Sequence, residues 1–182
     1  MRVLGVAGSL RRDSHNLRLL RAAALLLPPE VELVEFTALK AIPPFDEDDE
    51  SAPAAPVEQW RAAIVEADAL LFATPEYNHS IPGALKNAVD WASRPFATAA
   101  LRNKPAAVIG TSTGMFGAVW AQAELRKALA AAGARVLDRE LPVPDAENAF
   151  DGNGALREHD QELELGEILA ELLAEARART AA

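Results

Sequence analysis

Short apolar runs alternate along this chain with segments whose apolar residues recur on a helical period, and few folds accommodate that alternation. The expected strands are residues 2–7, 31–36, 69–74, 104–111 and 135–141. The expected helices are residues 14–27, 57–67, 82–91, 117–132 and 156–178. Because strands connected through helices run parallel, the pattern predicts an α/β fold, a doubly wound three-layer sandwich with helices on both faces of a parallel sheet.

The chain has 182 residues, enough for one domain that buries about 70% of its unfolded surface. No repeat or linker indicates a second domain, so we expect a single domain over residues 1–182, with a tail that frays after about residue 176. The proline-rich acidic stretch IPPFDEDDESAPAAP is expected to be an irregular loop.

Charge and composition exclude several classes of function. The formal net charge of −9 gives nucleic-acid binding no electrostatic support. The absence of cysteine excludes disulfides, thiolate metal sites and a cysteine nucleophile, and the three histidines have no metal-ligand spacing, so no metal is expected. No secretory signal is visible and the apolar runs are too short to span a bilayer, which favours a cytoplasmic protein that is not membrane-bound.

In an open parallel sheet, ligands bind beyond the carboxyl ends of the strands, so the loops there are the candidate site. The first is GSLRRDSHN, residues 8–16, which leads from a strand into a helix whose free N–H groups suit an anion. Its phosphate-suited side chains are those of Ser9, Arg11, Arg12, Ser14 and Asn16. A simple helix cap by Ser14 is the alternative. Walker A and GxGxxG patterns are missing, which favours a mononucleotide phosphate.

The second loop is TPEYNHSIPGALKNAVDW, residues 74–91. Pro75 restrains the end of a strand and Pro82 opens a helix, with a polar and aromatic segment between them. That segment can offer a planar ring both edge hydrogen bonds and a flat contact. The alternative is a polar connection held by side-chain turns.

The third loop begins at GTSTG, residues 110–114. Its small hydroxyl side chains and unhindered backbone allow a flat ligand to approach closely, although an ordinary strand-to-helix turn has the same composition. A GxSxG nucleophile elbow is absent, which argues against a serine hydrolase.

These loops resemble those of the flavodoxin-like NAD(P)H-dependent FMN reductases, a family that includes quinone, chromate and azo-dye reductases. GSLRRDSHN is similar to the family pattern GSLRxxSxN, and PEYNHSIPGALKNAVDW to PEYNxSxPGxLKNAxDW. STGMFGAVWAQAELRKAL resembles a third family segment, with a departure. Many members carry Gly-Gly and then arginine before Ala-Gln, whereas this chain has Gly117-Ala118 and Trp120.

The resemblance implies a flavodoxin-like five-stranded parallel sheet in the order 2-1-3-4-5, with noncovalently bound FMN. The residues it implies for the FMN phosphate are Ser9, Arg11, Ser14 and Asn16, with His15 and Leu17 nearby through their backbone. It implies a lining of the isoalloxazine ring by Pro75, Glu76, Tyr77 and Asn78, mostly through main-chain contacts. It also implies closure of the pyrimidine side of the ring by Ser112, Thr113 and Gly114.

The activity implied is a ping-pong cycle in which NADPH or NADH gives a hydride to flavin N5 and a small-molecule electron acceptor is then reduced. A quinone, azo dye, metal oxyanion or free flavin is the expected acceptor, and no catalytic side chain is required. A flavodoxin-type electron carrier is one alternative. A reductase that releases reduced FMN to a monooxygenase is another. The resemblance further implies a homodimer or homotetramer.

Overall fold

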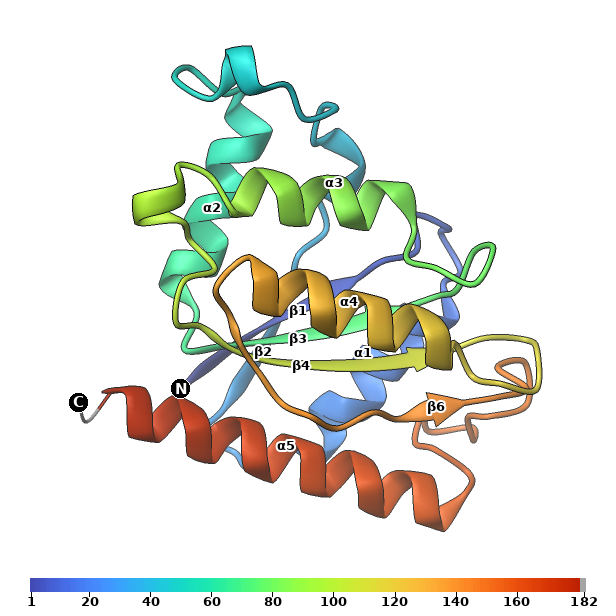
Figure 1. Ribbon diagram of the computed structural model, residues 1–182. Coiled ribbons are helices and arrows are strands. Elements are labelled where there is room, and N and C mark those ends of the chain that lie inside the picture. Colours follow the sequence, from blue (N-terminus) through green and yellow to red (C-terminus); the bar gives the residue numbers. More distant parts are fainter. Residues whose placement is uncertain (181–182) are drawn as a thin grey trace.

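The computed structural model describes residues 1–180, which build a parallel β-sheet between two layers of helices (Figure 1). The strands are β1 (Arg2–Ala7), β2 (Glu32–Glu35), β3 (Ala69–Thr74), β4 (Pro105–Thr111), β5 (Arg135–Val136) and β6 (Pro142–Val143). Their order is β2-β1-β3-β4-β5, and β6 pairs with β4 beyond β5. Every pairing is parallel, so the predicted strand order 2-1-3-4-5 is confirmed.

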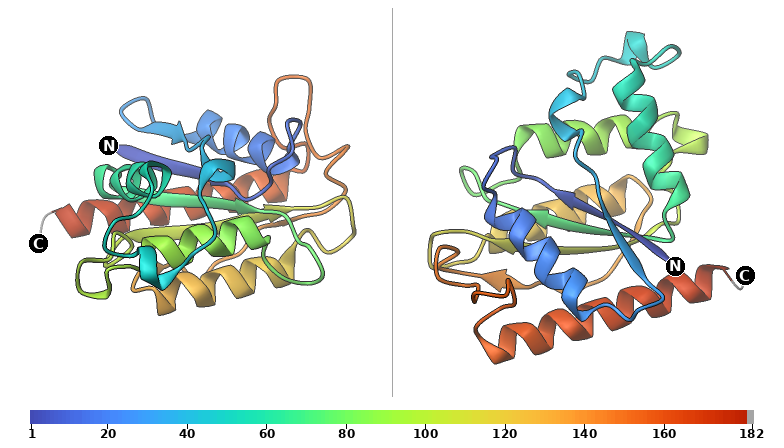
Figure 2. Two further views of the ribbon diagram at one scale, coloured as in Figure 1. Left: turned by 90° about the horizontal axis from the view of Figure 1, so that it is seen from above. Right: turned by 180° about the vertical axis from the view of Figure 1, so that it is seen from behind.

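Two sets of helices cover the two faces of the sheet (Figure 2). One face carries α1 (His15–Leu26) and α5 (His159–Thr180). The other carries α2 (Ala55–Glu66), α3 (Gly83–Ala92) and α4 (Val119–Ala131). Three short 3₁₀ helices lie in the connections: η1 (Leu39–Ala41), η2 (Glu47–Asp49) and η3 (Phe96–Thr98). The predicted three-layer α/β arrangement is therefore present.

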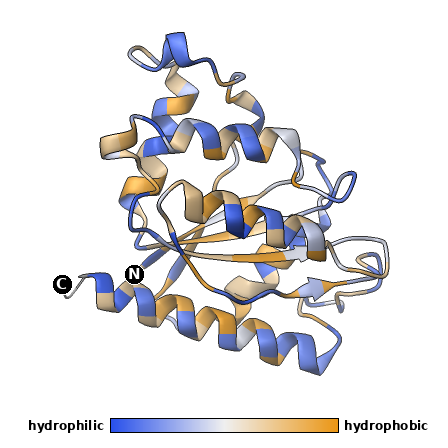
Figure 3. Ribbon diagram, in the orientation of Figure 1, coloured by the Kyte–Doolittle hydropathy of each residue, from blue (hydrophilic) through white to orange (hydrophobic). Residues whose placement is uncertain are grey.

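The central strand β3 is buried along its whole length because both of its faces are covered. Leu71 belongs to the core beneath α1 and α5, whereas Leu70 and Phe72 belong to the core beneath α2, α3 and α4. Burying side chains of this size contributes about 1.5–3 kcal/mol each. The hydropathy colouring shows apolar strands inside and polar residues on the outer sides of the helices (Figure 3). The continuous apolar run ALLFAT is thus a consequence of burial on two sides.

The strand predicted over residues 135–141 is wrong in its length. The structure contains two short strands, β5 and β6, and between them Leu137 and Leu141 still bond to β4 through their backbone while residues 138–140 do not. In that stretch Arg139 turns toward α5, where its guanidinium donates to Glu164 Oε1 at 2.8 Å and Glu167 Oε2 at 2.7 Å. The charged sequence DRE at 138–140 leaves the edge of the sheet because these ion pairs lie outside it.

Other boundaries also shift. The acidic stretch at 42–56 was expected to be irregular, but it contains η2, whose first turn is capped by Asp46 Oδ1 accepting from the Asp48 N–H at 3.0 Å. Helix α5 begins three residues later than predicted and continues to Thr180, and the fraying expected after about residue 176 stays a prediction. Ala176 is fully buried there, which holds this part of the helix on the core. Residues 181–182 lie outside the described part of the chain.

No helix within residues 1–180 is both long enough and apolar enough to cross a membrane.

Lys104 is a buried cation at the amino end of β4, with 4% of its surface exposed. Its ammonium donates to the carbonyl of Val65 at 2.9 Å and to the carbonyl of Ala67, so it caps the carboxyl end of α2. The pKa of Lys104 is lowered to about 8, mainly because the ammonium is buried and also because the charge of Arg179 is near, while Asp68 acts in the opposite direction.

We predict that this lysine makes stability rise with pH between about 8 and 10.5. Below pH 8 the Lys104 ammonium is charged in both the folded and the unfolded protein. Between pH 8 and 10.5 the folded protein has lost this proton and the unfolded protein still holds it. Because the unfolded state then binds more protons, the free energy of unfolding rises with pH. The gain over that window is on the order of 3 kcal/mol relative to Lys104→Met. Denaturant unfolding across the window measures it, with exposed Lys40→Met as the control. Parallel pH curves for wild type and Lys104→Met would contradict the prediction.

Candidate functional site

The loops that follow β1, β3 and β4 meet at one edge of the sheet, on the right in Figure 1. Between them lies a hollow of about 150 Å³. It is lined by Ser9, Arg11, Ser14, His15, Asn16, Pro75, Glu76, Tyr77, Thr111, Ser112 and Thr113. Apart from Thr111, these are all residues predicted for cofactor binding. The predicted residues outside this lining are Leu17, Asn78 and Gly114.

The first loop presents hydrogen-bond donors at the amino end of α1. Ser14 is the N-cap, and its Oγ accepts from the Leu17 N–H at 3.2 Å. Ser9 Oγ accepts from the Arg11 N–H at 3.4 Å. Each hydroxyl keeps its own proton to donate, and the first-turn N–H groups of His15 and Asn16 have no intrahelical partner. The donor set therefore suits a phosphate at the positive end of the helix dipole.

The two arginines of this loop add charge to that donor set. Arg11 and Arg12 are exposed, and no ion pair is recorded for either within residues 1–180. Arg11 lines the hollow, whereas Arg12 does not. Guanidinium groups without a carboxylate partner are available to an anionic ligand.

Asn16 has a different role from the one predicted for its side chain. Its Nδ2 donates to the Thr111 carbonyl at 3.0 Å, and its Oδ1 accepts from the Thr111 N–H at 3.1 Å. The cause is the end of β3, because β3 stops pairing with β4 at Thr74↔Gly110, and the Thr111 backbone groups on the β3 side have no strand partner although Thr111 pairs with Val143 of β6 on the other side. The Asn16 amide, 3% exposed, bonds to these groups and joins the first loop to the third.

The second loop contains a tight two-residue turn. Tyr77 and Ser80 exchange backbone hydrogen bonds of 3.0 and 3.1 Å, and Asn78 and His79 between them have φ values of 53° and 58°. Both residues are thus in the left-handed region, which the two-residue hairpin turn requires and which costs a residue such as histidine about 1 kcal/mol. The turn leaves Tyr77 48% exposed at the rim of the hollow.

Glu76 connects the second loop to the third. Its Oε2 accepts from the N–H groups of Trp120 and Ala121, both at 3.1 Å, which caps α4 where the N-cap residue Ala118 offers no side-chain hydrogen bond. Its Oε1 lies 3.4 Å from His79 Nδ1. The Glu76 carboxylate therefore has structural partners in both α4 and the turn of the second loop.

The far end of the third loop is fixed by Gly117 and Gln122. Gly117 has a φ of 55°, and a Cβ there would come 2.5 Å from the Pro142 carbonyl carbon. Buried Gln122 donates to the carbonyls of Gly117 and Leu141, both at 3.1 Å, and accepts from the Leu141 N–H at 2.9 Å. Ser112 and Gly114 are linked by a 3.3 Å bond from Ser112 Oγ to the Gly114 carbonyl.

Sequence reasoning missed a second hollow of about 380 Å³ that shares Arg11 and Tyr77 with the first. Its other lining residues are Gly8, Leu10, Pro82, Gly83 and Ala84. A Cβ added at Gly83 would meet nothing within 4 Å, so the start of α3 leaves open space there. The sequence feature that could have indicated this hollow is the run PGA at the start of a predicted helix. Its small side chains leave open space at the surface. A phosphate-suited hollow beside a shallow apolar one fits a mononucleotide with a flat ring.

Leu17, although it was predicted for cofactor binding, does not line the first hollow. It lines a neighbouring hollow with Ser9 and Leu10 on the β2 side, and its N–H already donates to Ser14.

The fold and this site define a flavodoxin-like mononucleotide-binding protein, and comparisons with known proteins agree. A family model for the NADPH-dependent FMN reductases matches residues 1–148. The chain is 45% identical over 158 residues to an NAD(P)H-dependent FMN reductase of Pseudomonas aeruginosa, covering 86% of this chain and 84% of that protein. It is 38% identical over 161 residues to a 2-hydroxy-1,4-benzoquinone reductase of a Burkholderia species, covering 88% and 87%.

Among solved structures, the chain is similar to the flavoenzyme NAD(P)H:(acceptor) oxidoreductase FerB of Paracoccus denitrificans. The TM-score is 0.85 at 32% sequence identity, and 97% of each chain is covered. The chain belongs to the NADPH-dependent FMN reductase family. It is accordingly an oxidoreductase of the class that uses FMN and NAD(P)H.

We predict that Asn16→Ala lowers the free energy of unfolding by about 2–4 kcal/mol, because it leaves both backbone groups of Thr111 without their partner. FMN affinity should fall with it, since the first and third loops lose their connection. Asn87→Ala is the matched control, because Asn87 bridges the Phe45 N–H and the Pro43 carbonyl in the same way, away from the site. Denaturant unfolding and FMN titration of both variants test this. Equal FMN affinities in the two variants would contradict it.

Proposed function

We propose that this chain is an FMN-dependent oxidoreductase that takes a hydride from NAD(P)H and then reduces a small acceptor, in a ping-pong cycle within a single flavodoxin-like domain over residues 1–182. The observation that supports this proposal best is the hollow in which the hydrogen-bond donors at the amino end of α1 lie opposite residues 75–77. Quinones, azo dyes, metal oxyanions and free flavin are the acceptor classes. For a quinone, NAD(P)H and a proton are consumed, and NAD(P)⁺ and a hydroquinone are formed. We place the reaction in the cytoplasm, where NAD(P)H is available.

The residues that would hold FMN are those of the three loops. Its phosphate would bind the hydroxyls of Ser9 and Ser14, the Arg11 guanidinium, and the backbone N–H groups at the start of α1. The full set proposed is Ser9, Arg11, Ser14, His15, Asn16, Leu17, Pro75, Glu76, Tyr77, Asn78, Ser112, Thr113 and Gly114. For Asn16 the proposal now rests on its backbone N–H, because its amide is bonded to Thr111.

When bound, FMN supplies a centre that accepts a hydride and passes two electrons to an acceptor. The residues of the chain bind and orient it. Backbone groups of residues 75–78 would contact the ring edge, since the Glu76 carboxylate is engaged by α4 and Asn78 forms the turn. Ser112, Thr113 and Gly114 would close the pyrimidine side. No side chain is assigned as a general acid or base.

Two alternatives use the same fold. A flavodoxin-type carrier would pass single electrons between proteins, and a flavin reductase would release reduced FMN to a monooxygenase. The family match and the arginine-containing loop favour the reductase over the carrier. Catalytic NAD(P)H consumption by the isolated protein with a quinone separates the reductase from the carrier. FMN retained through turnover argues against release to a monooxygenase. A colourless protein that cannot be loaded with FMN would refute all of these functions.

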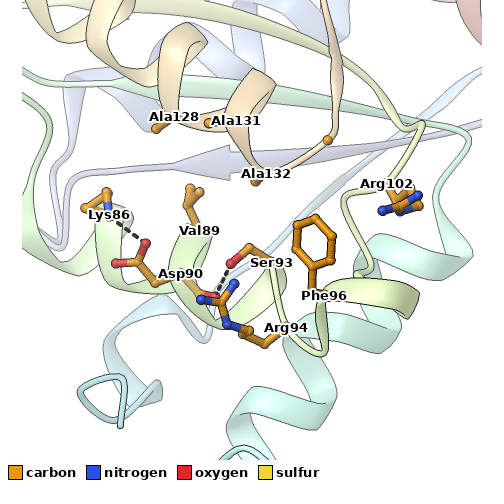
Figure 4. Close-up of a pocket in the computed structure, with 11 residues that line it drawn as sticks. Lys86, Val89, Asp90, Ser93, Arg94, Phe96, Arg102, Ala128, Ala131 and Ala132 are labelled. Atoms are coloured by element: carbon orange, nitrogen blue, oxygen red, sulfur yellow. Dashed lines mark hydrogen bonds and ion pairs between the residues drawn. The ribbon is translucent and has the colours of Figure 1, made fainter. Parts of the chain in front are cut away.

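We also propose that the protein is a homo-oligomer, a dimer or tetramer, that uses the groove between α3 and α4. Adjoining hollows of about 340 and 470 Å³ run along these helices. Figure 4 shows Ala128, Ala131 and Ala132 facing Val89, Lys86 and Asp90 across this groove. Small residues allow a second surface to approach closely. Charges of both signs, including Lys127 and Glu124, suit a two-fold contact in which each acid meets a base of the other copy.

We predict that Arg11→Ala weakens FMN binding about 10-fold, because a charge-assisted hydrogen bond to phosphate is lost. Riboflavin, which has no phosphate, should bind both proteins equally. Arg12→Ala is the control for charge, since it removes the same charge from the next residue, which lies outside the hollow. Fluorescence titration of FMN and riboflavin, with thermal unfolding to check the fold, measures the effect. Unchanged FMN affinity in Arg11→Ala would make the phosphate assignment wrong.

We predict that Ala128→Lys dissociates the oligomer, because a long charged side chain would fill the floor of the groove. Ala174→Lys on the exposed side of α5 is the matched control and should leave the assembly intact. Sedimentation velocity on the wild type and both variants measures the masses. A wild-type mass equal to one chain at micromolar concentration would refute the proposed oligomer.

A further inference from the structure

Exposed aromatic side chains gather on the second and third loops of the candidate site. Tyr77 is 48% exposed, Phe116 is 55% exposed and Trp120 is 40% exposed. Within the described residues, Phe96 is the other large aromatic side chain that is exposed, and it lies in the groove beside α3. Exposed apolar surface of this kind is uncommon away from binding sites.

Three of the rings on these loops form a continuous row, which we call the aromatic row: His79, Trp120 and Phe116. The His79 and Trp120 ring centroids are 4.8 Å apart with an interplanar angle of 90°. The Trp120 and Phe116 centroids are 4.9 Å apart at 61°. Edge-to-face contacts of this geometry are favourable. The row joins the turn of the second loop to the first turn of α4.

Glu76 contacts two residues of the aromatic row, Trp120 and His79. Its Oε2 accepts from the Trp120 N–H at 3.1 Å, which fixes the backbone under the indole ring. Its Oε1 lies 3.4 Å from His79 Nδ1, in a residue kept at a φ of 58°. Residues held in strained backbone conformations cluster at active sites and ligand-binding loops. The row is therefore a preorganised surface.

The position of the row relates it to the ligand hollows. Glu76 and its neighbour Tyr77 line the first hollow, and Tyr77 also lines the second. The row thus continues outward from the loop that would contact the flavin ring. Trp120 also stands where the family resemblance leads one to expect arginine, so this surface carries an aromatic ring at a position where a cation was expected.

We propose that the aromatic row is a recognition surface for flat aromatic electron acceptors, and that it gives the enzyme a preference for fused-ring quinones over small or non-aromatic acceptors. The inference rests on the proposed function, since it assigns the acceptor class of that same site. Its physical basis is the stacking of a planar acceptor against Trp120 and Phe116, which adds apolar contact that a small acceptor cannot make. His79 and Glu76 act as positioning residues for the indole.

The first test uses tryptophan fluorescence of the oxidised protein without any reductant. Trp60 and Trp91 are fully buried, whereas Trp120 is exposed. Titration with 2-methyl-1,4-naphthoquinone should quench the Trp120 emission in a saturable manner, and the Trp120→Phe protein should lose that component. A titration curve that is identical in wild type and Trp120→Phe would overturn the inference.

The second test compares the KM for 2-methyl-1,4-naphthoquinone with the KM for ferricyanide, a non-aromatic acceptor. The ratio should rise about 3- to 10-fold in Trp120→Ala and in Phe116→Ala, and less in Trp120→Phe, which keeps a ring. In Trp120→Ala, alanine is compatible with helix α4, and the backbone N–H of residue 120 can still donate to the Glu76 carboxylate. Leu163→Ala, which removes an exposed apolar side chain on α5, is the control for general surface effects.

The outcomes separate this inference from the proposed function. If wild type binds FMN and is reduced by NAD(P)H but the KM ratio is unchanged in both alanine variants, the acceptor surface is wrong and the function stands. If wild type neither binds FMN nor consumes NAD(P)H, the proposed function itself fails. A third outcome is that Trp120 becomes shielded from acrylamide quenching as protein concentration rises. A second copy would then cover the row, which would also overturn the inference.

Discussion

Burial of the central strands on both faces is the constraint on which the rest of this molecule depends. β3 and β4 have no exposed residue, so each must be covered by helices on both sides, and the connections between strands must cross over the sheet. Parallel strands then end at one edge together. The loops that follow β1, β3 and β4 are brought to that edge by the topology, whatever their own sequences prefer.

What turns three adjacent loops into a site is a set of side chains that bond from one loop to another. Asn16 completes the last peptide of β4, Glu76 caps α4, and Gln122 ties Gly117 to the β6 region. Each satisfies backbone groups that the sheet or a helix leaves without partners. These polar residues therefore fix loop geometry, while the groups left facing the hollow are mainly N–H donors, hydroxyls and Arg11. That division suits a cofactor that performs the redox chemistry itself.

The parts of the fold that sequence predicts well are those with a local cause. β1 and β3 have the predicted bounds because their apolar runs stop abruptly at Gly8 and Pro75. The strand expected over 135–141 divides because Arg139 pairs with α5, some 25 residues further along the chain, and no local pattern reports such a contact. The 3₁₀ turn at η2 was missed for the opposite reason, since a short cap by Asp46 is too weak a signal within an acidic, proline-rich stretch.

The candidate site divides along the same line. The residue types of the first loop indicate an anion site, because the loop leads from a strand into a helix and carries serine and arginine. The hydrogen-bond partners of the site residues could not be predicted from the sequence. The Asn16 contact spans 95 positions, and the Glu76 cap on α4 spans 44. Family patterns fix which residues occur without stating what each one does. Trp120 is an example of the converse: its side chain departs from the family pattern, and its backbone N–H still donates to the Glu76 carboxylate. A loop whose framework is fixed through backbone groups can change an outward side chain at little structural cost, which allows the framework of the candidate site to persist while the outer surface changes.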